Sequence, residues 1–139
     1  MRGAYEILIG IDPGTTTGLS VYSRDRKELL ALESGSLIEM YHLFTSYIKL
    51  GNVLVRIEDA RKRKWYGNRS NAKMQGAGSI KRDSKIWEEI CQFHEVDYKM
   101  IHPIKGATKL DAKAFRNITR WEGRTNEHQR DSAMIVYGL

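Results

Sequence analysis

A nearly continuous apolar run that ends in a carboxylate constrains the fold of this chain more than any other feature. Residues 5–12 read YEILIGID, and Pro13-Gly14 ends the run. A short apolar stretch with β-branched residues predicts a central strand that is buried on both faces. We therefore expect an α/β fold in which Asp12 stands at the carboxyl end of a buried strand.

The remaining sequence predicts strands and helices in the order βββαβαβα with one additional helix. Strands are expected at 18–22 and 28–34, and the charged turn at 24–27 between them indicates an antiparallel meander. Further strands are expected at 53–58 and 96–101. The expected helices cover 36–50, a long stretch after 73 with Met74, Ile80, Trp87, Ile90, Cys91 and His94 on one stripe, 111–121, and a last segment opened by a capping box at Asn126 and Gln129.

The positive charge of the chain is concentrated in one segment. The 139 residues, which are expected to form a single domain over 1–139, include 23 Lys and Arg and 17 Asp and Glu, for a net charge of +6. The segment 61–73 (RKRKWYGNRSNAK) contains six of the bases and no acid, so the remainder is neutral. Basic residues around Trp65 and Tyr66 are typical of a nucleic-acid-binding surface, where aromatic rings stack on bases. On charge alone, a solvated loop or a localisation signal at 61–64 is an equal alternative.

Cysteine content and hydropathy bear on where the protein works. The single Cys91 excludes an internal disulfide, fits a reducing compartment and is expected to be a small core residue. No apolar run approaches the ~20 residues of a membrane span, and the N-terminal residues do not resemble a signal peptide. We therefore expect a cytoplasmic protein.

Three acids stand at predicted element boundaries. Asp12 and Glu58 end two strands, Asp131 lies in the first turns of the last helix, and His128 shares its helical face. Clustered carboxylates raise each other's pKa unless a cation neutralises them, and oxygen ligands suit Mg²⁺ or Mn²⁺ better than Zn²⁺. Taken singly, each residue also has an ordinary role, as a turn former, a surface charge, a helix-dipole partner or a capping group.

The order of these motifs carries a resemblance to a known family. Residues 9–22 (IGIDPGTTTGLSVY), then Ile57-Glu58, then 128–134 (HQRDSAM) resemble the RuvC family of Holliday junction resolvases, in the ribonuclease H-like superfamily. The resemblance implies a five-stranded mixed sheet, with a meander of three antiparallel strands plus two parallel strands, flanked by helices. It also implies a homodimeric endodeoxyribonuclease of recombination and repair, which resolves four-way or other branched DNA by paired nicks. The short length resembles phage and prophage members, so a bacterial or phage-infected cell is the expected host.

The resemblance also implies roles for individual residues. Two Mg²⁺ or Mn²⁺ ions are expected per site, with Asp12 touching both and Glu58 and Asp131 each holding one. His128 falls where family members have Asp or His and is the fourth expected ligand. A lysine that assists catalysis in the family is expected at Lys109, with Lys113 as second choice. DNA contacts are expected from Arg61, Lys62, Arg63, Lys64, Trp65, Tyr66, Arg69 and Lys73, and Trp65-Tyr66 stands where the family inserts an aromatic residue at the junction centre.

Other functions are weaker expectations. Actin-like and sugar-kinase ATPases share the first motif, but they enclose a nucleotide between two domains. RuvC-like nucleases that trim ribosomal RNA precursors have no strand-end acid comparable to Glu58. Intact acids argue against a non-catalytic module that binds branched DNA. RNA processing and non-catalytic binding remain the alternatives to junction resolution.

Overall fold

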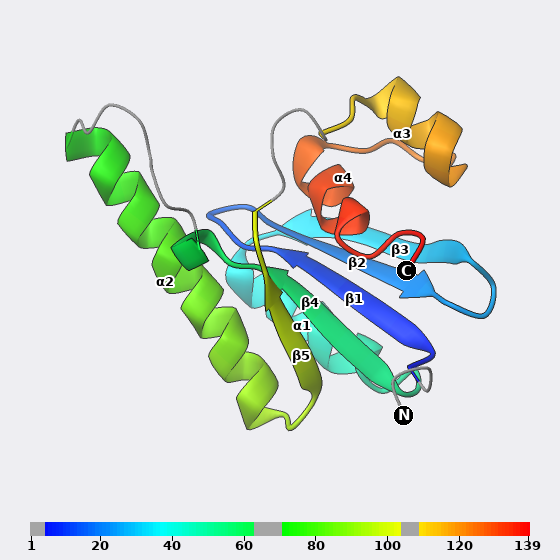
Figure 1. Ribbon diagram of the computed structural model, residues 1–139, viewed down its shortest axis with the longest axis horizontal. Coiled ribbons are helices and arrows are strands. Elements are labelled where there is room, and N and C mark those ends of the chain that lie inside the picture. Colours follow the sequence, from blue (N-terminus) through cyan, green and yellow to red (C-terminus); the bar gives the residue numbers. More distant parts are fainter. Residues whose placement is uncertain (1–4, 63–70, 104–108) are drawn as a thin grey trace.

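A mixed sheet of five strands in the spatial order β3-β2-β1-β4-β5 forms the centre of the described structure (Figure 1). The strands are β1 (Ile7–Asp12), β2 (Thr17–Ser23), β3 (Glu28–Gly35), β4 (Val53–Glu58) and β5 (Asp97–Ile101). β1, β2 and β3 form an antiparallel meander, whereas β4 runs parallel to β1 and β5 parallel to β4. This arrangement confirms the five-stranded mixed sheet that the sequence predicted.

The structure is a computed structural model that describes residues 5–62, 71–103 and 109–139, with the backbone alone described at 62, 71–77 and 80. The helices are α1 (Leu37–Tyr47), α2 (Asn71–Phe93), α3 (Ala112–Thr119) and α4 (Glu127–Met134), and a short 3₁₀ turn, η2 (Ala60–Lys62), follows β4. α1 and α2 pack on one face of the sheet, while α4, with α3 beside it, packs on the other (Figure 1). In the described ranges, no helix is both long and apolar enough to cross a bilayer.

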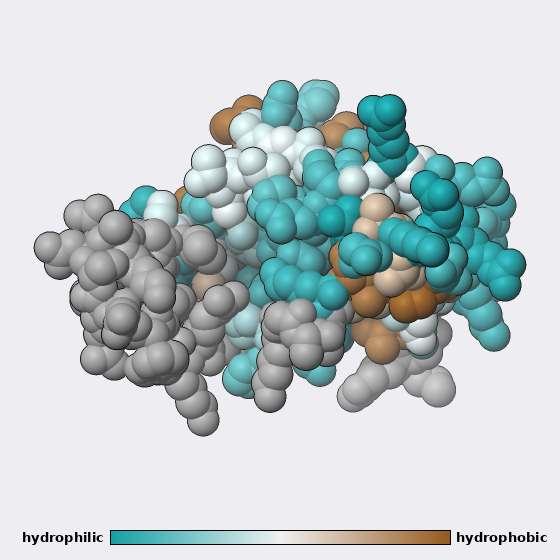
Figure 2. Space-filling view, turned by 90° about the horizontal axis from the view of Figure 1, so that it is seen from above, coloured by the Kyte–Doolittle hydropathy of each residue, from teal (hydrophilic) through white to brown (hydrophobic). Residues whose placement is uncertain are grey.

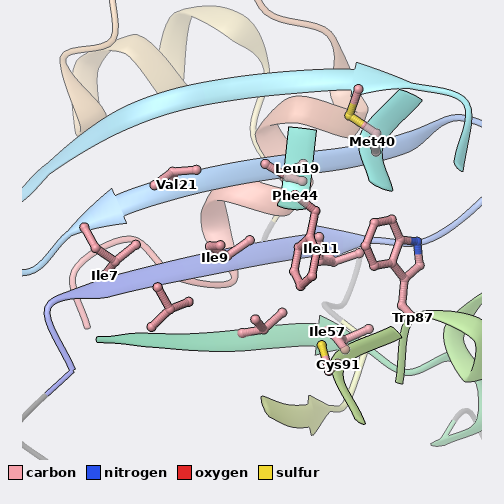
Figure 3. Close-up of a cluster of buried hydrophobic side chains, with 12 residues drawn as sticks. Ile7, Ile9, Ile11, Leu19, Val21, Met40, Phe44, Ile57, Trp87 and Cys91 are labelled. Carbon is pink, nitrogen blue, oxygen red and sulfur yellow. The ribbon is translucent and has the colours of Figure 1, made fainter. Parts of the chain in front are cut away.

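Alternation along β1 divides its side chains between two apolar layers. Ile7, Ile9 and Ile11 face α1 and α2, whereas Leu8 faces the layer that contains α4. In the first layer, the rings of Phe44 and Trp87 meet edge to face with centroids 5.5 Å apart (Figure 3). Full burial of side chains of this size contributes roughly 2–3 kcal/mol each. The central strand is therefore held from both sides, as its apolar sequence predicted.

The long helix uses its apolar stripe to pack against this core. Trp87 and Cys91 are fully buried against the sheet (Figure 3), which confirms Cys91 as a small core residue. Gly78 of the same helix faces open space, because an added Cβ there meets no atom within 4 Å.

Two helices are shorter than their sequence patterns predicted. α1 begins after Ser36, which forms a capping box with Glu39, and it ends at Tyr47 rather than at residue 50. α3 ends at Thr119, because Arg120 adopts a left-handed conformation (φ 64°) and donates its backbone N–H to the carbonyl of Arg116. Left-handed residues commonly end helices. Trp121 therefore lies outside the helix that was predicted to contain it.

Candidate active site

The carboxyl ends of β1 and β4 lie side by side and carry two acids. The parallel register pairs Ile11 with Ile57, so the next residue of each strand, Asp12 or Glu58, lies at the same edge of the sheet. They line a cavity of about 380 Å³ together with Lys109, His128 and Asp131. The two strand-end acids are therefore neighbours, and the last helix supplies a third acid, Asp131, at the same place.

Two glycines allow the last helix to approach the sheet. A Cβ added at Gly10 would collide with the carbonyl oxygen of Ser132, and one at Gly18 would collide with that of His128. The Ser20 hydroxyl donates a hydrogen bond of 2.8 Å to the Ser132 carbonyl from the adjacent strand. Glycine allows such contact because it has no side chain. The close packing of α4 on β1 and β2 places His128 and Asp131 above the end of β1.

The start of α4 is fixed by the capping box that the sequence predicted. The Asn126 side chain accepts a hydrogen bond from the Gln129 backbone N–H at 2.9 Å, and the Gln129 side chain accepts one from the Asn126 N–H at 3.0 Å. A cap of this kind satisfies backbone donors that the first helical turn leaves free. Asp131 is 8% exposed and lies just beyond this capped turn.

The end of β4 is anchored by a serine that sequence reasoning missed. Ser84 of α2 is fully buried, donates to the carbonyl oxygen of Glu58 at 3.2 Å and accepts from the Ala60 N–H at 3.3 Å. The Asp59 N–H donates to the Ile101 carbonyl at 2.8 Å. These bonds fix the backbone that directly follows the Glu58 side chain. A single serine in an amphipathic helix gives no sign of this role in the sequence.

Electrostatic crowding at the acids has a clear effect on Asp12. Its pKa is raised from 3.8 to about 8, first by burial, then by a hydrogen bond with Glu58 and by the negative charges of Glu58 and Asp131. Burial and like charge both penalise an ionised carboxylate. Without a bound cation, the neutral form of Asp12 is therefore favoured at neutral pH.

Lys109 brings a positive charge to the same group of acids. Its Nζ lies 2.8 Å from Oδ2 of Asp131, and about half of its side chain is exposed. Burial alone would lower the pKa of Lys109, but the hydrogen bond and charge of Asp131, with Glu58 and Asp12 further away, raise it overall. The structure thus brings the first-choice lysine to the acids, whereas Lys113 is exposed on α3 and does not line the cavity.

His128 faces Asp12 without bonding to it. The distance from Nδ1 of His128 to Oδ2 of Asp12 is 3.7 Å, which exceeds a hydrogen bond. Its Nε2 lies 3.9 Å from Oε1 of Glu127. The imidazole therefore lines the same cavity as the acids without a hydrogen bond to Asp12.

The donor atoms fit a hard divalent cation, although they are not gathered into a finished site. Four acidic residues, Asp12, Glu58, Asp131 and also Glu127, line one cavity with the His128 imidazole, and oxygen-rich sets of this kind suit Mg²⁺ or Mn²⁺. Within the described residues, no three His, Cys, Asp or Glu side chains lie close enough together to hold an ion as they stand. The Asp131–Lys109 pair and the Asp12–Glu58 hydrogen bond occupy acid oxygens in this arrangement.

The predicted DNA-binding segment lies mostly outside the described residues. Arg61 is described, and its guanidinium binds Oδ1 of Asp59 and Oε1 of Glu88, each at 2.8 Å. These ion pairs hold Arg61, which lies in η2, to the residue that follows β4 and to α2. The other members of the predicted DNA-binding set lie outside the described residues or have side chains that the structure does not describe: Lys62, Arg63, Lys64, Trp65, Tyr66, Arg69 and Lys73.

Comparison with known proteins supports the fold. No protein-family model matches the chain, and no curated protein matches it in sequence. Among solved structures, the chain is similar to T. thermophilus RuvC in complex with a Holliday junction substrate, with a TM-score of 0.58 and 20% sequence identity. The likeness covers 94% of this chain and 90% of the RuvC chain. The five-stranded mixed sheet and its flanking helices therefore form a ribonuclease H-like fold of the RuvC type.

Proposed function

We propose that the chain is a metal-dependent endonuclease that recognises branched DNA and resolves four-way junctions by paired nicks. The observation that carries this proposal is the meeting of Asp12, Glu58 and Asp131 in one cavity, at the edge of a RuvC-type sheet. The similar RuvC structure contains a Holliday junction, which supports branched DNA as the substrate class. Phosphodiester hydrolysis is the chemistry that such a set of acids serves when it holds divalent ions.

The residues of the cavity have distinct roles in this proposal. Asp12, Glu58 and Asp131 would hold two Mg²⁺ or Mn²⁺ ions, with His128 as the remaining ligand. When bound, such ions activate water and stabilise the leaving oxygen. Ser84 fixes the backbone at Glu58 through its two hydrogen bonds. The Lys109 ammonium, already 2.8 Å from Asp131, is positioned to offset negative charge as the phosphate is attacked.

The proposed partners follow from the symmetry of the substrate. A four-way junction must be cut in two strands at related positions, and a homodimer with a two-fold axis supplies two equivalent sites. The basic segment 61–73 begins three residues after Glu58, so it follows directly on the strand that carries this acid. We propose that this segment binds the phosphates of the junction and that Trp65 and Tyr66 enter its centre.

A panel of substrates tests this function. The full-length protein is incubated with Mg²⁺ or Mn²⁺ and with four-way, three-way, flap, linear duplex and RNA–DNA hybrid substrates of matched sequence. The proposal predicts symmetric nicks in the four-way junction, none in the linear duplex, and none in EDTA. Preferential cutting of the hybrid would indicate an RNA-processing enzyme. Junction binding without cutting under any metal condition would indicate a non-catalytic DNA-binding module.

A further inference from the structure

Half of one face of the sheet carries no helix among the described residues. α4 packs on β1, β2 and β3, whereas the same face of β4 and β5 lies beside it without such cover (Figure 1). Alternation places Leu54 and Arg56 of β4 and Lys99 of β5 on this open half, because Val55, Tyr98 and Met100 point to the opposite layer. A cavity of about 620 Å³ lies here, larger than the one at the acids.

Three cations from separate parts of the sheet line this cavity. Arg24 directly follows β2, Arg56 lies in β4 and Lys99 in β5. In the parts of the chain that the structure describes, none of the three forms an ion pair with a carboxylate. The nearby acid Asp97 instead accepts a hydrogen bond from the Tyr5 hydroxyl. Seen from above, most of the described surface is hydrophilic, with only a few hydrophobic patches (Figure 2).

Arg56 and Lys99 are direct neighbours across two strands. The parallel register pairs them, which brings their backbones to about 5 Å, and like charges opposite each other destabilise a sheet. The Arg56 side chain donates a hydrogen bond from its Nε to the Ile135 carbonyl at 2.9 Å, and the residue lines the cavity. A pair of adjacent cations without a carboxylate partner is the arrangement that a bound anion stabilises.

The position of Arg56 and Lys99 relative to the acids indicates which anion they would bind. Arg56 stands two residues before Glu58 on the same face of β4, so their Cα atoms are roughly 7 Å apart. We propose that Arg56 and Lys99, with Arg24 beyond them, bind the phosphodiester backbone of the DNA strand that leads away from Asp12 and Glu58. The inference rests on the proposed nuclease function and adds a binding surface separate from the segment 61–73.

Binding measurements with charge variants test this surface. In an Asp12→Asn background, which prevents cutting, affinity for a four-way junction is measured by fluorescence anisotropy over a series of salt concentrations. Lys99→Gln should weaken binding and lower the slope of log K against log salt by about 1, as expected when one phosphate contact is lost. Lys49→Gln, at an exposed position after α1, is the matched control and should bind like its parent.

A second pair of variants separates charge from packing at Arg56. Arg56→Gln removes the charge and the hydrogen bond to Ile135, whereas Arg56→Lys keeps the charge and loses the guanidinium bond. The inference predicts that Arg56→Lys retains the salt slope and Arg56→Gln does not. A merely structural role would make both variants alike in affinity and in melting temperature.

Neutral linkages in the DNA locate the contact. A single methylphosphonate is placed at each linkage within four nucleotides of the cut, and binding is compared in the parent and in Lys99→Gln. The inference predicts one linkage at which the methylphosphonate weakens DNA binding by the parent but does not weaken DNA binding by Lys99→Gln. If Lys99→Gln and Arg56→Gln bind like Lys49→Gln while wild-type protein still cuts junctions, the surface is wrong and the proposed function stands. If the parent binds no branched DNA at low salt, both are wrong.

Discussion

The Nζ atom of Lys109 lies 2.8 Å from Oδ2 of Asp131, so an ammonium group stands beside the acids at the end of the sheet. Its charge opposes the rise in the pKa of Asp12 that burial, Glu58 and Asp131 cause. The chain therefore contains part of the positive charge that its clustered carboxylates require. We expect the remainder from divalent ions during catalysis.

Removal of this ammonium should affect both stability and activity. Lys109→Met leaves Asp131 and Asp12 without the opposing charge. Because Lys109 is half exposed, the free energy of unfolding of the metal-free protein should fall by about 1 kcal/mol. A loss of that size lowers the melting temperature by a few degrees. Cleavage of a four-way junction in Mg²⁺ should fall at least about tenfold, a difference of roughly 1.4 kcal/mol in the barrier.

Lys113→Met is the matched control for this change. Lys113 is exposed on α3 and does not line the cavity, so neither the melting temperature nor the cleavage rate should change. Equal behaviour of Lys109→Met and Lys113→Met in both measurements would refute a role for Lys109.

The stability of the metal-free protein should depend on pH through Asp12. The pKa of Asp12 is about 8 in the folded chain and near 3.8 in the unfolded chain, so the folded state binds a proton that the unfolded state has lost. The stability that this proton contributes is complete below pH ~4 and is lost as pH rises from ~4 to ~8. Asp12→Asn removes this dependence. In EDTA at pH 9, the variant should melt several degrees above wild type, and the gap should close near pH 4.

Thermal unfolding over this pH range checks the prediction. Asp25→Asn changes an exposed turn residue and should follow the wild-type curve at every pH. Saturating Mg²⁺ should stabilise wild type more than Asp12→Asn at pH 9, because bound ions favour the ionised acids. A wild-type curve in EDTA that is parallel to that of Asp12→Asn would contradict the electrostatic account.

Much of this site follows from local sequence signals. The strand at 53–58 and the capping box at Asn126 are set by neighbouring residues, and both are observed where they were predicted. The acids Asp12 and Glu58 mark strand ends, and parallel pairing of β1 with β4 brings them together. The likeness of the first motif to the RuvC family pointed to the same sheet.

Features that depend on packing between distant segments were not predictable in this way. Gly10 and Gly18 look like ordinary strand glycines until α4 lies on them. Arg56 and Lys99 are 43 positions apart in the sequence, but the sheet pairs them. The net charge outside the segment 61–73 is zero, so charge summed along the sequence does not reveal this pair. The end of α3 depends on the left-handed conformation of Arg120, which helical periodicity does not reveal.

The two packing glycines give a third prediction. Gly10→Ala forces the added methyl group against the Ser132 carbonyl and within 2.7 Å of the Ser20 hydroxyl oxygen, and Gly18→Ala does the same at the His128 carbonyl. Each should cost about 1–3 kcal/mol and should lower junction cleavage, because α4 must move away from Asp12. Gly78→Ala is the matched control in open space, and it should raise stability by up to about 1 kcal/mol. Normal cleavage by Gly10→Ala would show that the position of α4 is not critical.

The aromatic pair of the basic segment gives a fourth prediction. Contacts between bases and aromatic side chains contribute about 1–3 kcal/mol each. Trp65→Ala with Tyr66→Ala should therefore impair the opening of the junction centre, seen by 2-aminopurine fluorescence, and slow its resolution. Phe93→Ala is the control, because it removes an aromatic ring from a residue that is 79% exposed at the end of α2. Unchanged fluorescence and cleavage in the double variant would exclude the wedge role.

The central claim is that the strand-end acids carry out metal-dependent cleavage, and Asp12→Asn tests it most directly. The amide keeps the size of the side chain but removes the charge that the proposed ions require. Losing a residue that hydrogen-bonds a metal ligand lowers activity roughly 10- to 100-fold. Because Asp12 is itself a proposed ligand, the account predicts a larger fall in the cleavage of a four-way junction in Mg²⁺ or Mn²⁺. Junction binding should survive, and Asp25→Asn should cut normally. Cleavage by Asp12→Asn at the wild-type rate would contradict the assignment of the site.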